Sequence, residues 1–195
     1  MRIIAGAWRG RKISAPPGEL TRPTADRTRE TLFSMLTSRL GSFEGLMVAD
    51  LFAGSGALGI EALSRGAAKC VFVENDAAGN RALKANLAGL EAGQRSDLRA
   101  SSVMTLGATP APLDLVMLDP PYKSGAGEVA LERLVRLGWI GPATWVSLET
   151  MFNEVPSVPT LVIDDTRKIG KARLTLFQGL AQRLEAAEPE EPRTA

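Results

Sequence analysis

The sequence predicts one α/β domain built on a mostly parallel β-sheet. From Leu46 onward, short apolar runs alternate with stretches of helical periodicity, which is typical of parallel strands joined by crossover helices. Two late apolar runs follow each other without room for a long helix, which indicates an antiparallel pair at one edge of the sheet. The length of 195 residues agrees with a single domain.

The first 40 residues are predicted to form a basic extension made of a hairpin and a helix. The segments Arg2–Ala5 and Arg11–Ser14 indicate a short β-hairpin. The helix that follows is expected to have Thr24 or Asp26 as its cap and to run to about Arg39. We therefore place the first boundary of the chain after residue 40.

Residues 41–182 are predicted to hold the alternating strands and helices of the main domain. The expected strands are Met47–Ala53, Lys69–Glu74, Leu98–Ser101, Leu113–Leu118, Trp145–Glu149, Thr160–Ile163 and Ala172–Phe177. The expected helices are Leu58–Arg65, Arg81–Leu90 and Glu128–Leu137. Residues 183–195 are rich in Glu, Pro and Ala, and we expect them to form a disordered acidic tail.

The composition excludes several kinds of chemistry. With no histidine and one cysteine, the chain has no Ser-His-Asp triad, no Cys-His pair, no internal disulfide and no His-ligated or all-Cys metal site. An enzyme of this composition must work with carboxylates, backbone groups, Arg, Lys or Tyr side chains, or a cofactor. No apolar run reaches the roughly 18 residues of a membrane span, and the start does not resemble a signal peptide. The expected location is the cytoplasm.

The net charge of +1 hides a basic N-terminus. Residues 1–40 carry eight Lys or Arg and three acidic residues, so the rest of the chain is net negative. A positive surface attracts phosphates, although such a cluster can equally be a solvated face. A second basic cluster lies between Arg167 and Arg173, and its role stays open.

A glycine-rich loop, residues 50–59, follows the first expected strand and opens a helix. Glycines let the backbone turn tightly and approach a ligand closely. The carboxylate of Asp50 would repel the pyrophosphate of a dinucleotide but suits an ammonium group. Glu74 ends the next strand, where it can accept hydrogen bonds from both hydroxyls of a ribose. A ligand with a ribose, a cationic end and no phosphate is S-adenosylmethionine; the alternative is that Asp50 caps the helix and Glu74 is only solvated.

The segment Asp119-Pro120-Pro121-Tyr122 follows a buried strand and is expected at the same edge of the sheet. The prolines fix φ and make the turn rigid. The exocyclic amino group of a base is poorly nucleophilic, because its lone pair is delocalised into the ring. The Asp119 carboxylate and the Pro120 carbonyl can each accept one of its N–H groups and hold the nitrogen toward a sulfonium methyl. Tyr122 would stack on a base that has left its helix or loop, and no histidine base is needed.

These segments together resemble class I S-adenosylmethionine-dependent methyltransferases that act on amino groups. With Arg2–Lys12 and Arg22–Phe33 included, the chain is similar from about Arg2 to Phe177 to the bacterial RsmD-type 16S ribosomal RNA guanine-N2 methyltransferases. The resemblance implies a Rossmann-like sheet of seven strands whose last strand is antiparallel, S-adenosylmethionine as cofactor and no metal. It also implies 16S rRNA, within a 30S subunit or an assembly intermediate, as the partner of a monomeric enzyme.

The resemblance also implies roles for individual residues. Those expected at the methyl-transfer site are Asp119, Pro120, Pro121 and Tyr122. Those expected at the cofactor are Asp50, Phe52, Ala53, Gly54, Gly56, Glu74, Asn75, Asp76, Ser102, Thr24 and Arg27. Those expected on RNA are Arg9, Arg11, Lys12 and Arg22, while Trp8 either stacks on RNA or packs in the core. Ser102 stands where relatives often carry Asn or Asp for the adenine amino group, and its hydroxyl can still accept that hydrogen bond.

Two other interpretations stay open at this point. The first is N6-adenine or protein glutamine methylation, because an acid or amide followed by Pro-Pro-Tyr can hold any planar amino group. DNA enzymes of this kind usually carry a separate recognition domain, for which this chain is too short. The second is a non-catalytic RNA-binding assembly factor. The presence of Asp50, Glu74 and Asp119 together argues against it, since such a factor need not keep all three.

Overall fold

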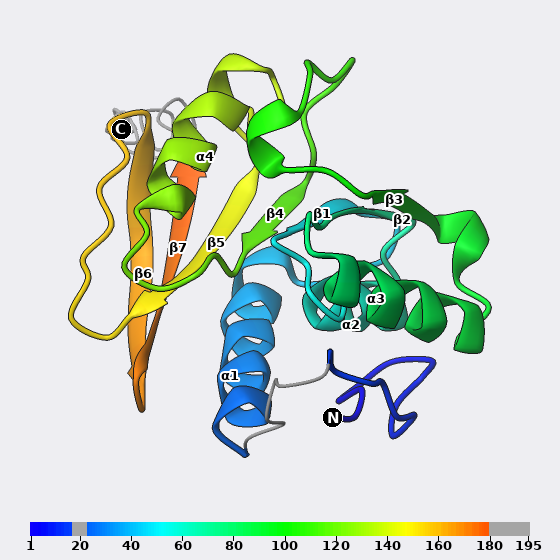
Figure 1. The fold of residues 1–195 in the computed structure, drawn as a ribbon. Coiled ribbons are helices and arrows are strands. Elements are labelled where there is room, and N and C mark those ends of the chain that lie inside the picture. Colours follow the sequence, from blue (N-terminus) through cyan, green and yellow to red (C-terminus); the bar gives the residue numbers. More distant parts are fainter. Residues whose placement is uncertain (17–22, 180–195) are drawn as a thin grey trace, which may run out of the picture.

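The computed structural model describes residues 1–16 and 23–179. Within these ranges seven strands form one sheet in the order β3-β2-β1-β4-β5-β7-β6 (Figure 1). The strands are β1 (Met47–Leu51), β2 (Lys69–Val73), β3 (Ser96–Arg99), β4 (Leu115–Leu118), β5 (Trp145–Met151), β6 (Leu161–Ile169) and β7 (Ala172–Gly179). The strands β1 to β5 pair in parallel, whereas β7 lies antiparallel between β5 and β6. The predicted fold class, including the antiparallel last strand, is confirmed.

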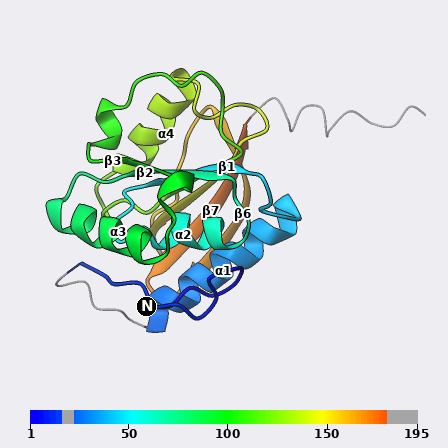
Figure 2. The same cartoon turned by 90° about the vertical axis from the view of Figure 1, so that its right-hand side faces the viewer.

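Helices cover both faces of this sheet. They are α1 (Pro23–Leu40), α2 (Ala57–Ser64), α3 (Ala77–Gly89) and α4 (Ala126–Arg136), with short 3₁₀ turns η1 (Gly93–Arg95) and η2 (Val103–Thr105). Figure 2 shows α1, α2 and α3 on one face of the sheet and α4 on the other. In the described part of the chain, no helix is long and apolar enough to cross a membrane.

The alternation of side chains along β1 explains the two hydrophobic clusters. Successive residues of a strand point to opposite faces. Val48 therefore packs in the cluster formed with α1, α2 and α3, whereas Ala49 and Leu51 pack in the cluster formed with α4. Asp50 shares the face of Val48, so its carboxylate is directed toward α2 and is 1% exposed. Coverage of both faces also explains why all of β4 is apolar and buried.

The predicted N-terminal hairpin is reduced to a single antiparallel bridge between Arg2 and Lys12. The bridge does not extend into a longer ladder because a side chain takes the backbone donors of Ile4 and Ala5. The N–H groups of Ile4 and Ala5 donate to the carboxylate of Glu61 on α2, at 2.8 and 3.0 Å. Residues 1–16 therefore form a loop, here called the N-terminal loop. Backbone hydrogen bonds such as Ile3 N–H to the Arg11 carbonyl at 3.0 Å join its arms, and Glu61 attaches it to the main domain.

Several element boundaries differ from the prediction; α3, for example, begins at Ala77, before the predicted start at Arg81. The helix α1 begins at Pro23, so Thr24 and Asp26 lie inside its first turn and do not precede it; proline suits that turn because it has no N–H to satisfy. The strand β3 begins at Ser96, two residues before the predicted start. The strand β6 runs on to Ile169, because its polar second half pairs with β7 at the solvated edge of the sheet.

The helix α1 packs into the main domain. Leu32, Phe33 and Leu36 belong to the same hydrophobic cluster as side chains of β1, β2 and α2. Arg39 at the end of α1 forms ion pairs with Asp164 and Asp165 of β6, at 2.9 and 3.1 Å. The boundary after residue 40 stays a prediction, and the tail at 183–195 lies outside the described residues.

Candidate functional site

The carboxyl ends of β1, β2, β4 and β5 surround one open cavity of about 950 Å³. Many of the residues singled out from the sequence lie on its wall: Asp50, Phe52, Ala53, Gly54, Glu74, Asn75, Asp76, Asp119, Pro120, Pro121 and Tyr122. The topology brings them together, because parallel strands end at the same edge of a sheet. Ligands of open α/β sheets bind at this edge, which makes the cavity the candidate site.

The glycine loop is fixed by hydrogen bonds to the two buried carboxylates behind it. The N–H of Gly59 donates to Oδ2 of Asp50 at 2.8 Å, and the N–H of Gly54 donates to Oε2 of Glu74 at 2.6 Å. Gly56 has φ of +79°, and a Cβ there would lie 2.3 Å from Cδ1 of Leu83. Gly56 therefore allows the loop to pack against α3 and does not itself line the cavity.

Asp50 is the most perturbed carboxylate of the site. Burial raises its pKa from the ordinary value of 3.8 to about 7; the N–H of Gly59 opposes the rise, the negative charge of Glu74 adds to it, and the N–H of Leu58 opposes it. A cation placed in the cavity would stabilise the ionised carboxylate and oppose this effect. The position therefore suits a positively charged ligand and disfavours a phosphate.

Glu74 is 7% exposed and already accepts two backbone hydrogen bonds. Besides Gly54, the N–H of Asp76 donates to its Oε1 at 2.6 Å. A carboxylate has about four lone-pair sites, so Glu74 can accept further hydrogen bonds from a ligand. Asp76 caps α3 by accepting from the N–H of Gly79 at 2.7 Å, and Asn75 is exposed beside it.

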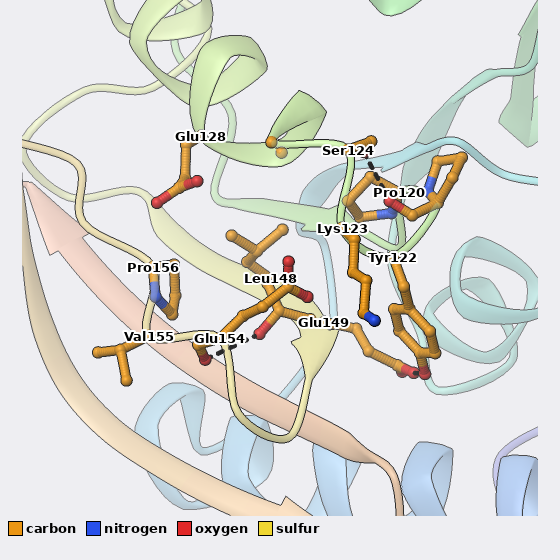
Figure 3. Close-up of a pocket in the computed structure, with 14 residues that line it drawn as sticks. Pro120, Tyr122, Lys123, Ser124, Glu128, Leu148, Glu149, Glu154, Val155 and Pro156 are labelled. Atoms are coloured by element: carbon orange, nitrogen blue, oxygen red, sulfur yellow. Dashed lines mark hydrogen bonds between the residues drawn. The ribbon is translucent and has the colours of Figure 1, made fainter.

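The Asp-Pro-Pro-Tyr segment starts where β4 ends. Asp119 is exposed at the cavity, and its N–H donates to the carbonyl of Leu51 on β1 at 3.4 Å. Tyr122 is 42% exposed, and its hydroxyl donates to Oε1 of Glu149 at 2.6 Å (Figure 3). Burial and this hydrogen bond raise the pKa of Tyr122, so the phenol stays protonated. The tyrosine ring is thereby held in one orientation beside Asp119.

Sequence reasoning placed α1 at the cofactor through Thr24 and Arg27 but did not find the α1 residues that line the cavity. Asp26, Thr28, Arg29 and Leu32 line the cavity, whereas Arg27 is exposed and does not. The signal was available in the helical period, because residues three or four before a core leucine share its face. Of the other α1 prediction, Thr24, only the backbone is described.

Arg29 connects α1 to the N-terminal loop. Its guanidinium donates to the carbonyl of Arg2 and pairs with Asp26 at 3.1 Å. The arginine side chain is 6% exposed, so a buried side chain of the cavity wall connects α1 to the N-terminal loop.

The predicted RNA-binding cations of the N-terminal loop, Arg9, Arg11 and Lys12, are all exposed. Arg11 donates one hydrogen bond to the carbonyl of Gly89 at the end of α3. Trp8 packs against the hydrophobic cluster, with the guanidinium of Arg95 4.9 Å from its ring centroid. Of the two roles open for this tryptophan, the structure therefore shows packing. Arg22 lies outside the described residues.

Ser102 does not line the cavity. Its hydroxyl accepts a hydrogen bond from the N–H of Met104 at 3.2 Å and caps the short turn η2. The role expected for Ser102 at the adenine stays a prediction.

Comparison with known proteins gives a consistent result. The family described as "Conserved hypothetical protein 95" matches residues 1–178. "Ribosomal RNA small subunit methyltransferase D" of Escherichia coli K12 is 38% identical over 184 residues, covering 93% of this chain and 91% of the relative. The Haemophilus influenzae protein of the same name is 38% identical over 181 residues, covering 89% of this chain and 92% of the relative.

The solved structures agree. The Escherichia coli chain described as "Putative methyltransferase yhhF" superposes with a TM-score of 0.81 at 38% identity, covering 93% of this chain and 99% of that one. Magnesium protoporphyrin IX methyltransferase from Synechocystis, at 15% identity and a TM-score of 0.60 over 80% of each chain, shares the class I methyltransferase fold. The chain therefore belongs to the RsmD family of ribosomal RNA methyltransferases.

Proposed function

We propose that this chain transfers a methyl group from S-adenosylmethionine to the N2 amino group of a guanine in 16S ribosomal RNA. The observation that supports this most directly is the single cavity wall on which Asp50, Glu74 and Asp119 meet. Two of these carboxylates are buried and fit a cationic nucleoside, and the third is exposed beside a rigid turn and fits an amino group.

The residues on the wall fit S-adenosylmethionine. The cavity of about 950 Å³ lies within the roughly 300–1,000 Å³ of typical small-molecule sites. Glu74 has lone pairs left for the ribose hydroxyls, and the carboxylate of Asp50 offers negative charge to the ammonium end. When bound, the cofactor supplies an electrophilic methyl group on a positively charged sulfur.

The Asp119 turn would prepare the acceptor. The Asp119 carboxylate and the Pro120 carbonyl each accept one N–H of the guanine amino group, which orients the nitrogen and favours its pyramidal, more nucleophilic form. Asp119 is also the nearest base in this turn for the proton that the nitrogen gives up. Tyr122, held by Glu149, stacks against the base.

The N-terminal loop provides a surface for the RNA. Its exposed cations, Arg9, Arg11 and Lys12, can contact phosphates, which position a substrate without reading its sequence. We propose a 30S subunit or an assembly intermediate as the substrate, acted on by a monomer in the cytoplasm.

The test is incubation with labelled S-adenosylmethionine and bare 16S rRNA, 30S subunits or DNA, followed by digestion and identification of the methylated nucleoside. We expect N2-methylguanosine from a ribosomal substrate. N6-methyladenosine, or label on DNA alone, would contradict the proposal in favour of an adenine enzyme. RNA binding without any methyl transfer would favour an assembly factor.

A pair of variants separates the two halves of the site. Asp119→Ala should abolish transfer while calorimetry shows S-adenosylhomocysteine binding within about threefold of the unmodified chain, because Asp119 contacts the base. Asp50→Ala should weaken that binding itself. Loss of cofactor affinity in Asp119→Ala would contradict the role assigned to Asp119.

A further inference from the structure

We propose that Glu149 selects guanine by accepting a hydrogen bond from its N1–H group, next to the amino group held by Asp119. Glu149 would thus determine which base this enzyme methylates. This inference rests on the proposed function, since it concerns the base that the same cavity receives.

The sheet register places Glu149 beside Asp119. Leu148 of β5 pairs in parallel with Leu118 of β4, and both leucines point into the cluster formed with α4. Glu149 follows Leu148 on β5, and Asp119 follows Leu118 directly after the end of β4. Neighbouring strands lie about 4.8 Å apart. Both residues line the large cavity at this edge of the sheet, so one base in the cavity can reach both carboxylates.

Glu149 also borders a second, smaller cavity of about 280 Å³ behind the Asp-Pro-Pro-Tyr turn. Figure 3 shows the side chains of Glu149 and Tyr122 meeting at their tips in front of this space. The carboxylate thus lies between the two cavities, where a base stacked on Tyr122 would present an edge to it.

One oxygen of Glu149 is engaged and the other is available. The Tyr122 hydroxyl donates to Oε1 at 2.6 Å, which fixes the carboxylate, whereas no hydrogen bond from the described residues reaches Oε2. Burial raises the pKa of Glu149 and the hydrogen bond from Tyr122 lowers it. An additional N–H donor would stabilise the ionised form further.

Two adjacent carboxylates match guanine and mismatch adenine. The Watson–Crick edge of guanine presents the N2 amino group and the N1–H group next to each other, and both are donors. Adenine presents its amino group next to an unprotonated N1, which is an acceptor. Adenine held by Asp119 would therefore place a lone pair against Oε2 of Glu149. A site built to accept a hydrogen bond discriminates strongly against an analogue that lacks the donor. A difference in shape alone gives much weaker discrimination.

The alternative role for Glu149 is to orient Tyr122 alone, and three variants separate the two roles. Tyr122→Phe removes the hydrogen bond but keeps the carboxylate, Glu149→Ala removes the carboxylate, and the double variant removes both. With 30S subunits as substrate, we expect Glu149→Ala to lower kcat/KM by about 100-fold or more and Tyr122→Phe by about fivefold. Equal losses in all three variants would show that Glu149 acts only through Tyr122 and would overturn the proposal.

A second measurement tests the contact directly. Guanosine and 2-aminopurine riboside both carry the amino group, but only guanosine has an N1–H, so guanosine should inhibit 30S methylation more strongly. In Glu149→Ala the two nucleosides should inhibit equally. The contact would be refuted if guanosine did not inhibit the unmodified enzyme more strongly than 2-aminopurine riboside. It would also be refuted if Glu149→Ala were still inhibited more strongly by guanosine.

Two controls keep this inference separate from the proposed function. Calorimetric binding of S-adenosylhomocysteine to Glu149→Ala should match the unmodified chain, which shows that the variant folds. If the unmodified chain does not produce N2-methylguanosine, the proposed function fails; if it does and Glu149→Ala retains full kcat/KM, only the role of Glu149 fails.

Discussion

Replacing Asp50 with Asn should stabilise the folded protein at neutral and alkaline pH while removing its affinity for the cofactor. Asp50 is fully buried, and burial raises its pKa from 3.8 to about 7. In the folded chain the Asp50 carboxyl keeps its proton up to about pH 7, whereas in the unfolded chain it loses the proton near pH 4. As the pH rises through this window, the unfolded state is therefore favoured. An Asn side chain cannot ionise, and its oxygen can still accept the hydrogen bond from Gly59.

The expected magnitude follows from the two pKa values. A pKa unit corresponds to about 1.4 kcal/mol, so the whole shift amounts to about 4 kcal/mol of lost stability well above pH 7. At pH 5 only about 2 kcal/mol of this has been lost, because pH 5 lies only about one unit above the ordinary pKa of the unfolded carboxyl. Between pH 5 and pH 8 the unmodified chain should lose about 3 kcal/mol relative to Asp50→Asn.

The assay is urea unfolding of the ligand-free protein at pH 5 and pH 8, with the difference in unfolding free energy between the two chains as the measured quantity. Glu132→Gln is the matched control, because Glu132 is an exposed carboxylate on α4. That control should shift the difference by less than about 0.5 kcal/mol. An Asp50→Asn protein that follows the same pH dependence as the unmodified chain would refute the argument from burial.

Three further predictions concern packing, reactivity and charge. Gly56→Ala should lower the unfolding free energy by about 3 kcal/mol, because the added Cβ would lie 2.3 Å from Leu83 at a φ of +79°. Gly10→Ala is the control, since Gly10 has a φ of +81° but open space around it. In the same urea assay it should cost only about 1 kcal/mol. Cys70 is fully buried, so a thiol reagent should modify it only after unfolding, and rapid labelling of the native protein would contradict its burial. Replacing Arg9, Arg11 and Lys12 with Ala should reduce the salt slope of RNA binding by about 2 to 3. An unchanged slope, or an equal reduction in Arg136→Ala on α4, would place the RNA surface elsewhere.

The order of helices and strands could be predicted well, because the spacing of apolar residues shows which faces of an element are buried against other elements. Leu115–Leu118 is apolar throughout, and this strand, β4, lies at the centre of the sheet with helices on both faces. The second half of β6 escaped prediction because Asp164–Lys168 is polar. Its strand geometry comes from pairing with β7 at a sheet edge, and that pairing leaves no periodic apolar signal.

The same contrast applies to the site. The residues at the carboxyl ends of the strands could be placed together from topology alone. The parallel pairing of β4 with β5 would also have indicated Glu149, which follows Leu148 at the same edge of the sheet. The wall formed by Asp26 and Arg29 could not be placed in this way. It depends on how α1 lies across the sheet, which is set by tertiary packing of Leu32 and its neighbours.

The position of the N-terminal loop shows why part of the fold leaves no local signal. The side-chain amide of Asn86 on α3 accepts from the N–H of Ser14 at 2.8 Å and donates to the carbonyls of Ser14 and Ser55, each at 2.9 Å. Ser14 belongs to the N-terminal loop and Ser55 to the glycine loop, so one buried amide holds both. Because Asn offers a donor pair and an acceptor within one short group, an apolar residue there would leave backbone groups of both loops unpaired. The N-terminal loop and the glycine loop are therefore both held by hydrogen bonds to α3. A single polar residue in a helical pattern does not indicate from the sequence which loops it will bind.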